Sequence, residues 1–235
     1  MRIAHVVTLM SDSGAYGGPV SVACAQAKAL QNRGHRVQLV ALWKGRSAPP
    51  SHVDGVELNA ATARAFIPRT GFLGLFSWSY PRVLWRVIGE SDVVHIHTGR
   101  DLASLAAHAV AALRRRRVVV QTHGMVQVRT SLTARVFDLF LGPLLGRASA
   151  CLVLTDQEHS ELTTILGHRS PPLIYLPNGV PDGQHLAVPG RSDPIALFLA
   201  RLHTGKRPEA LQPLGRWIPT RKSLEQQAFQ GSAAT

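Results

Sequence analysis

The fold is decided by three consecutive segments: Asp92-Val-Val-His-Ile-His97, the alanine-rich segment 101–113 and Val118-Val-Val-Gln-Thr122. The two apolar runs predict strands, and the segment between them predicts a helix. Each run is apolar on consecutive residues rather than on every second one. Such strands are typical of a parallel sheet that is covered by helices on both faces.

The same alternation of strand and helix continues on both sides of this stretch. We predict further strands over 2–9, 35–42, 56–58, 151–155 and 173–176, and further helices over 19–33, 80–89, 130–147 and 157–166. Pro19 suits a first helical turn, Gly34 suits a helix end, and Asp156 is expected to cap the helix that follows it. The sequence therefore predicts an α/β domain with a Rossmann-like, doubly wound parallel sheet over residues 1–181.

The pattern changes beyond this domain. Residues 182–194 contain glycine, proline and polar residues and are expected to be a linker, and Ile195-Ala-Leu-Phe-Leu-Ala200 predicts a new strand. Regular periodicity ends at about residue 211, and residues 212–235 carry no pattern. We therefore expect an incomplete second domain, with the chain truncated shortly after entering it.

The net charge and the cysteines indicate which partners and which cellular environment to expect. The chain has 26 Lys and Arg against 14 Asp and Glu, a net charge of +12 that favours nucleic acid, anionic lipid or phosphorylated ligands. The run Arg114–Arg117 is expected to be a solvated turn, with a membrane or phosphate contact as the alternative. No nucleic-acid motif is present, so we expect no nucleic-acid partner. Cys24 and Cys151 lie far apart in apolar segments, which indicates a reducing, cytoplasmic setting.

Two features bear on membranes. No apolar stretch reaches the length of a membrane span. Residues 71–88 are rich in aromatic residues and end in an arginine-bearing stretch, so they either form a helix packed on their own domain, which we favour, or lie on a bilayer. Peripheral contact at the inner face of the membrane therefore stays open.

Four loops carry candidate binding residues. Gly17-Gly18 precede the first helix, where glycines and a helix N-terminus favour an anion, although the spacing is not that of a dinucleotide fingerprint. His123 follows a strand whose carboxyl end faces the ligand crevice of such sheets, and there it can donate to a hydroxyl or a phosphate. Asn178-Gly179 form a turn. Arg201 and Lys206, five residues apart, can flank a diphosphate or lie on a solvated surface.

His95 and His97 also lie at a strand end. The alternation of side chains puts both on one face of the strand. The sequence shows no third ligand beside them, so we expect no metal site.

Taken together and in this order, the motifs resemble those of the family 4 glycosyltransferases, retaining enzymes of the GT-B fold. The resemblance covers about residues 1–211 and rests on six motifs: Gly17-Gly18-Pro19, Gly34-His35-Arg-Val, Asp92-Val-Val-His-Ile-His97, Thr122-His123-Gly124, Pro177-Asn178-Gly179-Val180 and Ala200-Arg201-Leu through Lys206. It implies transfer of a sugar from a nucleotide diphosphate-sugar to a hydroxyl acceptor, glycan or lipid-linked, with retention of configuration and no cofactor or metal.

The resemblance also implies roles for individual residues. Gly17 and Gly18 would touch the donor phosphate or the acceptor, and His123 the transferred sugar. Asn178 and Gly179 would mark the crossing into the second domain. Arg201 and Lys206 would hold the donor diphosphate, within a fragment of the nucleotide-sugar-binding domain at 195–211.

Two departures from the family pattern affect the expected activity. Ala200 stands where the family usually has glycine. The family's two glutamates, separated by seven residues in the C-terminal domain, are missing, since Glu209 and Glu225 are the only acidic residues after Lys206. We expect the chain to be inactive alone. The alternative function is a non-catalytic module that binds an acceptor or a partner, as one subunit of a split transferase.

Overall fold

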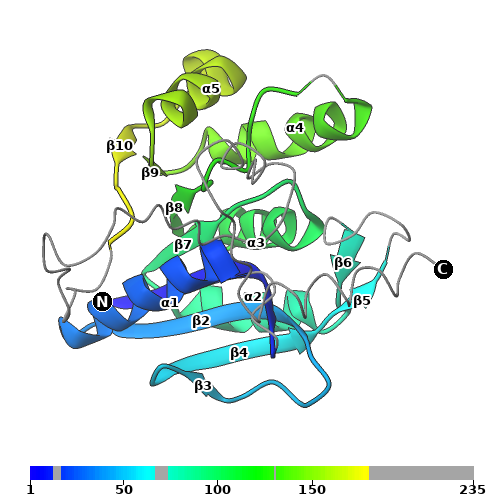
Figure 1. The fold of residues 1–235 in the computed structure, drawn as a ribbon, viewed down its shortest axis with the longest axis vertical. Helices are drawn as coiled ribbons and strands as arrows, with labels where there is room; N and C mark the ends of the chain where they lie inside the picture. The colour runs from blue at the N-terminus through cyan, green and yellow to red at the C-terminus, as the bar shows by residue number, and fades with distance from the viewer. Residues whose placement is uncertain (13–16, 67–73, 130, 180–235) are drawn as a thin grey trace, which may run out of the picture. The chain divides into compact units, whose positions relative to one another are not determined.

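The computed structural model describes residues 1–12, 17–66, 74–129 and 131–179, and all structural statements below refer to these residues. An eight-stranded sheet runs through them in the order β10-β9-β8-β7-β1-β2-β4-β3 (Figure 1). Its strands are β1 (Arg2–Ser11), β2 (Arg36–Lys44), β3 (His52–Val53), β4 (Val56–Thr62), β7 (Val93–His97), β8 (Arg117–Gln121), β9 (Ala150–Val153) and β10 (Leu173–Tyr175).

The strand order confirms the predicted doubly wound parallel sheet. All neighbouring pairs are parallel except β3 with β4, at the edge. From β1 the chain builds outward through β2 and β4, then returns to the other side of β1 and builds outward again from β7 to β10. The direction of building therefore reverses between β1 and β7, and the sheet's ligand crevice is expected at the carboxyl ends of these strands.

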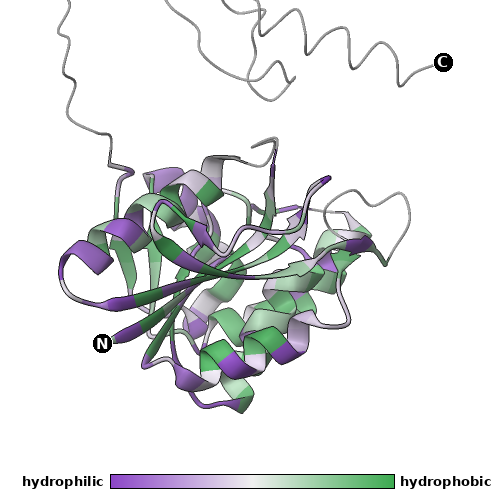
Figure 2. Ribbon diagram, turned by 90° about the horizontal axis from the view of Figure 1, so that it is seen from below, coloured by the Kyte–Doolittle hydropathy of each residue, from purple (hydrophilic) through white to green (hydrophobic). Residues whose placement is uncertain are grey.

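Helices cover both faces of the sheet. Helix α1 (Gly17–Asn32) packs Ala23, Cys24 and Ala27 on one face. The second core cluster, on the other face, includes residues of α2 (Tyr80–Glu90), α3 (Leu102–Leu113), α4 (Leu132–Leu145) and α5 (Asp156–Leu166). Figure 2 shows hydrophobic residues along the central strands and on the helices that flank them.

Three short strands were not predicted from the sequence. They are β3 and the hairpin of β5 (Arg64–Ala65) with β6 (Leu75–Phe76), each two residues long. Two residues cannot display a period, so only pairing with a neighbour defines them as strands.

Within the segment 71–88, helix α2 packs on its own domain, whereas Trp78 and Trp85 are 77% and 47% exposed. Tyr80, Leu84, Val87 and Ile88 of α2 are buried. The arginine run after α3 is more engaged than predicted for a solvated turn. Arg115 and Arg117 are exposed, but Arg114 lies 4.7 Å above the Trp85 ring, and Arg116 donates to the Gly89 carbonyl.

The predicted cap of α5 is wrong by one residue. Thr155 is the cap: its backbone is extended at the end of the strand, and its hydroxyl accepts a hydrogen bond from the Glu158 amide at 3.2 Å. Asp156 is the first helical residue, and its carboxylate accepts a hydrogen bond from the Tyr175 hydroxyl at 2.7 Å.

Several expectations concern residues beyond 181, which lie outside the described part of the chain. They are the linker 182–194, the fragment 195–211 with Arg201 and Lys206, and the tail 212–235. None of the described helices is both long enough and apolar enough to cross a membrane.

Candidate functional site

The start of α1 lies at the carboxyl edge of the sheet, beside the point where the strand order reverses. Gly17 is the first helical residue, so the amides of the first turn have no partner within the helix, and they favour an anion. A Cβ added to Gly18 would meet no atom within 4 Å. Packing therefore does not require glycine at position 18, and the space beside it is open to a ligand.

His123 occupies a tight turn directly after β8. The Met125 amide donates to the Thr122 carbonyl at 2.8 Å across this turn. Both central residues have positive φ, +51° at His123 and +68° at Gly124. Histidine rarely adopts this left-handed conformation, which costs about 1–2 kcal/mol relative to glycine. Surrounding contacts must therefore hold the turn in place.

Glu158 supplies these contacts. Its buried carboxylate accepts hydrogen bonds from the Thr122 hydroxyl and from the Gly124 amide, the latter at 2.6 Å. The second carboxylate oxygen accepts from the Leu154 amide at 2.7 Å. One side chain in the first turn of α5 thus ties the ends of β8 and β9 together.

The sequence analysis missed Glu158. The Thr155-x-x-Glu158 spacing matches a helix capping box, a signal that would have marked the helix start. It would not have revealed that the carboxylate reaches a turn 34 residues away in sequence.

Four histidines form a connected chain that leads from His123 into the core. His123 Nε2 lies 2.8 Å from His97 Nδ1, and His97 Nε2 lies 3.2 Å from His5 Nδ1. His95 stacks on His97 with ring centroids 4.4 Å apart and contacts His5 at 4.7 Å. His5 and His95 are direct partners across β1 and β7, so the register of these strands brings the rings together.

Burial makes these imidazoles neutral at pH 7. It lowers the pKa of His5 to about 4 and the pKa of both His95 and His97 well below the usual 6.5. The pKa of His123 falls to about 4, because burial lowers it more than the nearby Glu158 carboxylate raises it.

The expectation that His95 and His97 lack a third potential ligand is wrong. His5 joins them, and one nitrogen from each of the three rings lies within 4.8 Å of the others. A tetrahedral zinc site requires ligand nitrogens about 3.3 Å apart. His5 Nδ1 and His97 Nε2 meet this spacing, but they are partners in a hydrogen bond whose proton an ion would have to displace. His5 and His97 are therefore arranged as a hydrogen-bonded pair, and His95 contacts both rings.

A glutamine pair extends this buried polar layer beneath α1. Gln26 of α1 donates to Gln121 of β8 at 3.0 Å, so α1 reaches across the sheet toward the His123 turn. Asp101 fixes the neighbouring loop after β7, since it accepts hydrogen bonds from Thr8 at 3.0 Å and from the Ser104 amide at 2.7 Å. Burial raises the pKa of Asp101.

The other predicted site residues are not gathered here. Asn178 and Gly179 are exposed and follow β10, at the same edge of the sheet but two strands from β8. At the usual strand spacing this places them about 10 Å from the His123 turn. The structure thus places the start of α1 and the His123 turn at the carboxyl ends of β1 and β8, where a ligand crevice is expected, and places Asn178 and Gly179 farther along the same edge.

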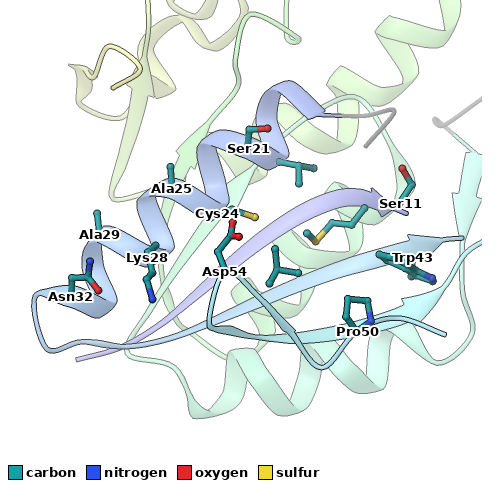
Figure 3. A pocket seen from close by; sticks show the side chains of 13 residues that line it. Ser11, Ser21, Cys24, Ala25, Lys28, Ala29, Asn32, Trp43, Pro50 and Asp54 are labelled. Carbon is teal, nitrogen blue, oxygen red and sulfur yellow. The ribbon is translucent and has the colours of Figure 1, made fainter. Parts of the chain in front are cut away.

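A separate groove of about 720 Å³ runs along the other flank of α1 (Figure 3). Helix residues line one side, including Cys24 and Lys28, while Trp43, Pro50 and Asp54 line the opposite side. None of the predicted site residues and none of the four chain histidines lines it. It is therefore distinct from the crevice.

The fold is that of a doubly wound α/β domain. Residues 17–179 match the family model of the glycosyl transferase 4-like domain, and the chain belongs to this family. A search of curated proteins gives no match.

A search of solved structures gives matches at low sequence identity. Sucrose-phosphate synthase from Thermosynechococcus elongatus is 16% identical, with a TM-score of 0.53 over 75% of this chain and 47% of that one. An alpha-glucosyltransferase in complex with UDP is 15% identical, with a TM-score of 0.46 over 77% and 44%. MurG from Acinetobacter baumannii is 13% identical, with a TM-score of 0.40 over 67% and 42%. This chain thus matches less than half the length of each of these proteins.

Proposed function

We propose that this chain forms the acceptor-side domain of a glycosyltransferase. The reaction would move a sugar from a nucleotide diphosphate-sugar to an acceptor hydroxyl, with retention of configuration. The observation that carries the proposal is that the start of α1 follows β1 and the His123 turn follows β8, both at the carboxyl edge of a parallel sheet, within a domain that the family model matches.

The chemistry follows from what these groups can donate. The backbone amides of the first turn of α1, which have no partner within the helix, favour a phosphate oxygen. The open space at Gly18 lets this oxygen approach. His123, neutral and fixed by its turn, would contact the transferred sugar. Arg201 and Lys206 would neutralise the diphosphate as it leaves, in place of a metal ion. Asn178 and Gly179 would mark the crossing into the donor side.

The test is a transfer assay with the full chain. UDP- and GDP-sugars carrying a labelled sugar would be incubated with glycan and lipid-linked acceptors, and both labelled product and released nucleoside diphosphate would be measured. We expect no transfer by the chain alone; if it does transfer sugar, His123→Ala should abolish the transfer and the exposed His168→Ala should leave it unchanged. The anomeric configuration of the product, read by proton NMR, tests retention.

The alternative is a non-catalytic module that recognises the acceptor or a partner subunit. Saturable acceptor binding without sugar transfer or nucleotide release would support it. Donor binding that weakens about tenfold or more in Arg201→Ala or Lys206→Ala would favour the transferase, because a charge-assisted contact to phosphate is lost. If neither donor nor acceptor binds, both versions are wrong.

We also propose that α4 contacts an anionic membrane. Its outward face carries Leu132, Val136, Leu139 and Phe140, which are 49–78% exposed and recur at helical spacing. Arg129, Arg135 and Arg147 are exposed on and beside the same helix. An amphipathic helix with apolar and cationic residues outward fits the interface of an anionic bilayer.

Vesicle sedimentation tests this contact. We expect binding to vesicles containing phosphatidylglycerol, weaker binding to pure phosphatidylcholine, and loss of binding in Leu139→Glu/Phe140→Glu. The matched control is Thr163→Glu/Thr164→Glu on the exposed side of α5. Equal binding by both double variants would contradict the assignment to α4.

A further inference from the structure

The histidine chain ends at the residue that the proposed function places against the sugar. We propose that His97 and His5 fix His123 in the tautomer that carries its proton on Nδ1, so that the turn presents an N–H donor to the crevice. The tautomer follows from the hydrogen bonds inside the protein, while its use toward a ligand rests on the proposed function.

The first step is the polarity of the chain. His97 uses both ring nitrogens, Nδ1 toward His123 at 2.8 Å and Nε2 toward His5 at 3.2 Å. A neutral imidazole has one donor and one acceptor. If His97 donates to His123, it must accept from His5, and if it accepts from His123, it must donate to His5. The two hydrogen bonds therefore run in the same direction, and only two arrangements exist.

The second step chooses between the two arrangements at the inner end. His5 Nε2 is buried and has no hydrogen-bond partner among the described residues. In one arrangement His5 donates through Nδ1, so Nε2 is a bare lone pair. In the other arrangement Nε2 carries a proton with no acceptor. An orphaned buried N–H is rarer in proteins than an under-used acceptor, so the first arrangement is favoured.

The third step follows the chosen direction to the surface. His5 donates to His97, and His97 donates through Nδ1 to Nε2 of His123. Since His123 is neutral, its proton must then lie on Nδ1. Free histidine prefers its proton on Nε2, so the chain opposes the intrinsic preference and makes the effect measurable.

The surroundings keep the rings in register. His95 stacks on His97 with an interplanar angle of 23°, and His123 stacks on His97 at 15°. Glu158 fixes the backbone on both sides of His123 through Thr122 and Gly124. His97 thus acts as a positioning residue, because it touches His123 and lies buried beneath it.

An N–H on Nδ1 suits one class of ligand atom. It can donate to a sugar hydroxyl oxygen or a phosphoryl oxygen. It cannot take a proton from the hydroxyl group of the acceptor substrate. The inference therefore assigns His123 the role of donor, and excludes the role of general base in the resting protein.

The experiment uses NMR of the full chain labelled with ¹⁵N-histidine, and reads the tautomer of each ring from its two nitrogen shifts at pH 7. Signals of His123 and His97 would be assigned by their loss in His123→Gln and His97→Leu. We expect wild-type His123 to carry its proton on Nδ1. In His97→Leu we expect the tautomer ratio to move toward Nε2–H by about two- to tenfold, the effect of one hydrogen bond.

Two further variants distinguish an effect of His97 on the tautomer of His123 from a general loss of folding. His97→Gln keeps a donor that can reach His123, so it is expected to restore part of the Nδ1–H population. His108→Gln is the matched control, since His108 is equally buried but bonds to Thr98 at 2.9 Å, outside the chain, and should leave His123 unchanged.

Three outcomes would overturn the inference. They are a wild-type His123 protonated on Nε2, an unchanged ratio in His97→Leu, and metal-shifted histidine signals that EDTA abolishes. If His97→Leu fails to fold, the wild-type spectrum, with His123 assigned through His123→Gln, still decides the tautomer. Adding a donor sugar-nucleotide then tests the use of this N–H: a shift at His123 Nδ1 supports it. No shift at His123 with a donor that binds would refute the ligand role and leave the tautomer assignment intact.

Discussion

At the scale of single residues, Glu158 stabilises the strained turn at His123. Three donors converge on its carboxylate, which is 3% exposed. In Glu158→Gln the side-chain nitrogen of the glutamine cannot accept a hydrogen bond, so one of these donors loses its partner. We therefore expect the free energy of unfolding to fall by about 1–3 kcal/mol. Urea denaturation measures this change. Glu161→Gln, which alters a contact with Gln157 near the surface, should change the free energy by less than about 0.5 kcal/mol, and an equal loss in both would contradict the role of Glu158.

At the scale of an element, the glycine at the proposed ligand site at the start of α1 lowers the stability of the helix. Alanine at position 18 would meet no atom within 4 Å and has the higher helix propensity. We therefore expect Gly18→Ala to raise stability by up to about 1 kcal/mol. The same methyl group would occupy the space beside the free amides, so affinity for a nucleotide-sugar should fall. Calorimetric unfolding and titration with UDP-sugars measure the two effects. Unchanged affinity together with raised stability would show that Gly18 does not line the site.

At the scale of the whole molecule, buried histidines make the fold sensitive to acid. Burial lowers the pKa of His5 and His108 to about 4 and that of His97 well below 6.5. Between about pH 6.5 and pH 4 the unfolded chain therefore binds more protons than the folded one, so stability is full above pH 6.5 and decreases as the pH falls. His5 and His108 each cost roughly 2 kcal/mol by pH 5, and two such costs are a large share of the stability of a typical domain.

Urea denaturation at pH 7 and pH 5 checks this expectation. The free energy of unfolding should fall by several kcal/mol at pH 5, and His108→Gln should reduce the difference between the two pH values. His168→Gln, which changes an exposed histidine, serves as the control. A free energy of unfolding that does not depend on pH in this window would mean that the buried imidazoles are not forced to be neutral.

The sequence by itself determined the elements and the fold class. Continuous apolar runs such as Val118–Val120 are buried in a parallel sheet, and the alanine-rich segment between two of them is α3, because the period of apolar residues is a local property of the chain. The same local signals placed Gly18 and His123 at strand-to-helix connections. Strands of two residues and the capping residue of α5 were missed or misplaced, since such short signals depend on their neighbours.

Only the tertiary structure decided how the site is assembled. The strand register sets His5 beside His95, and the closeness of β8 and β9 brings Glu158 to the turn at Thr122 and Gly124. Alternation along a strand predicts which face a side chain occupies, but not which residue of a distant strand lies opposite. His97, the partner of His123, lies 26 residues before it, and Glu158, which holds the neighbouring Thr122 and Gly124, lies far beyond it in sequence. Their meeting is therefore a property of pairing and packing, which no local pattern contains.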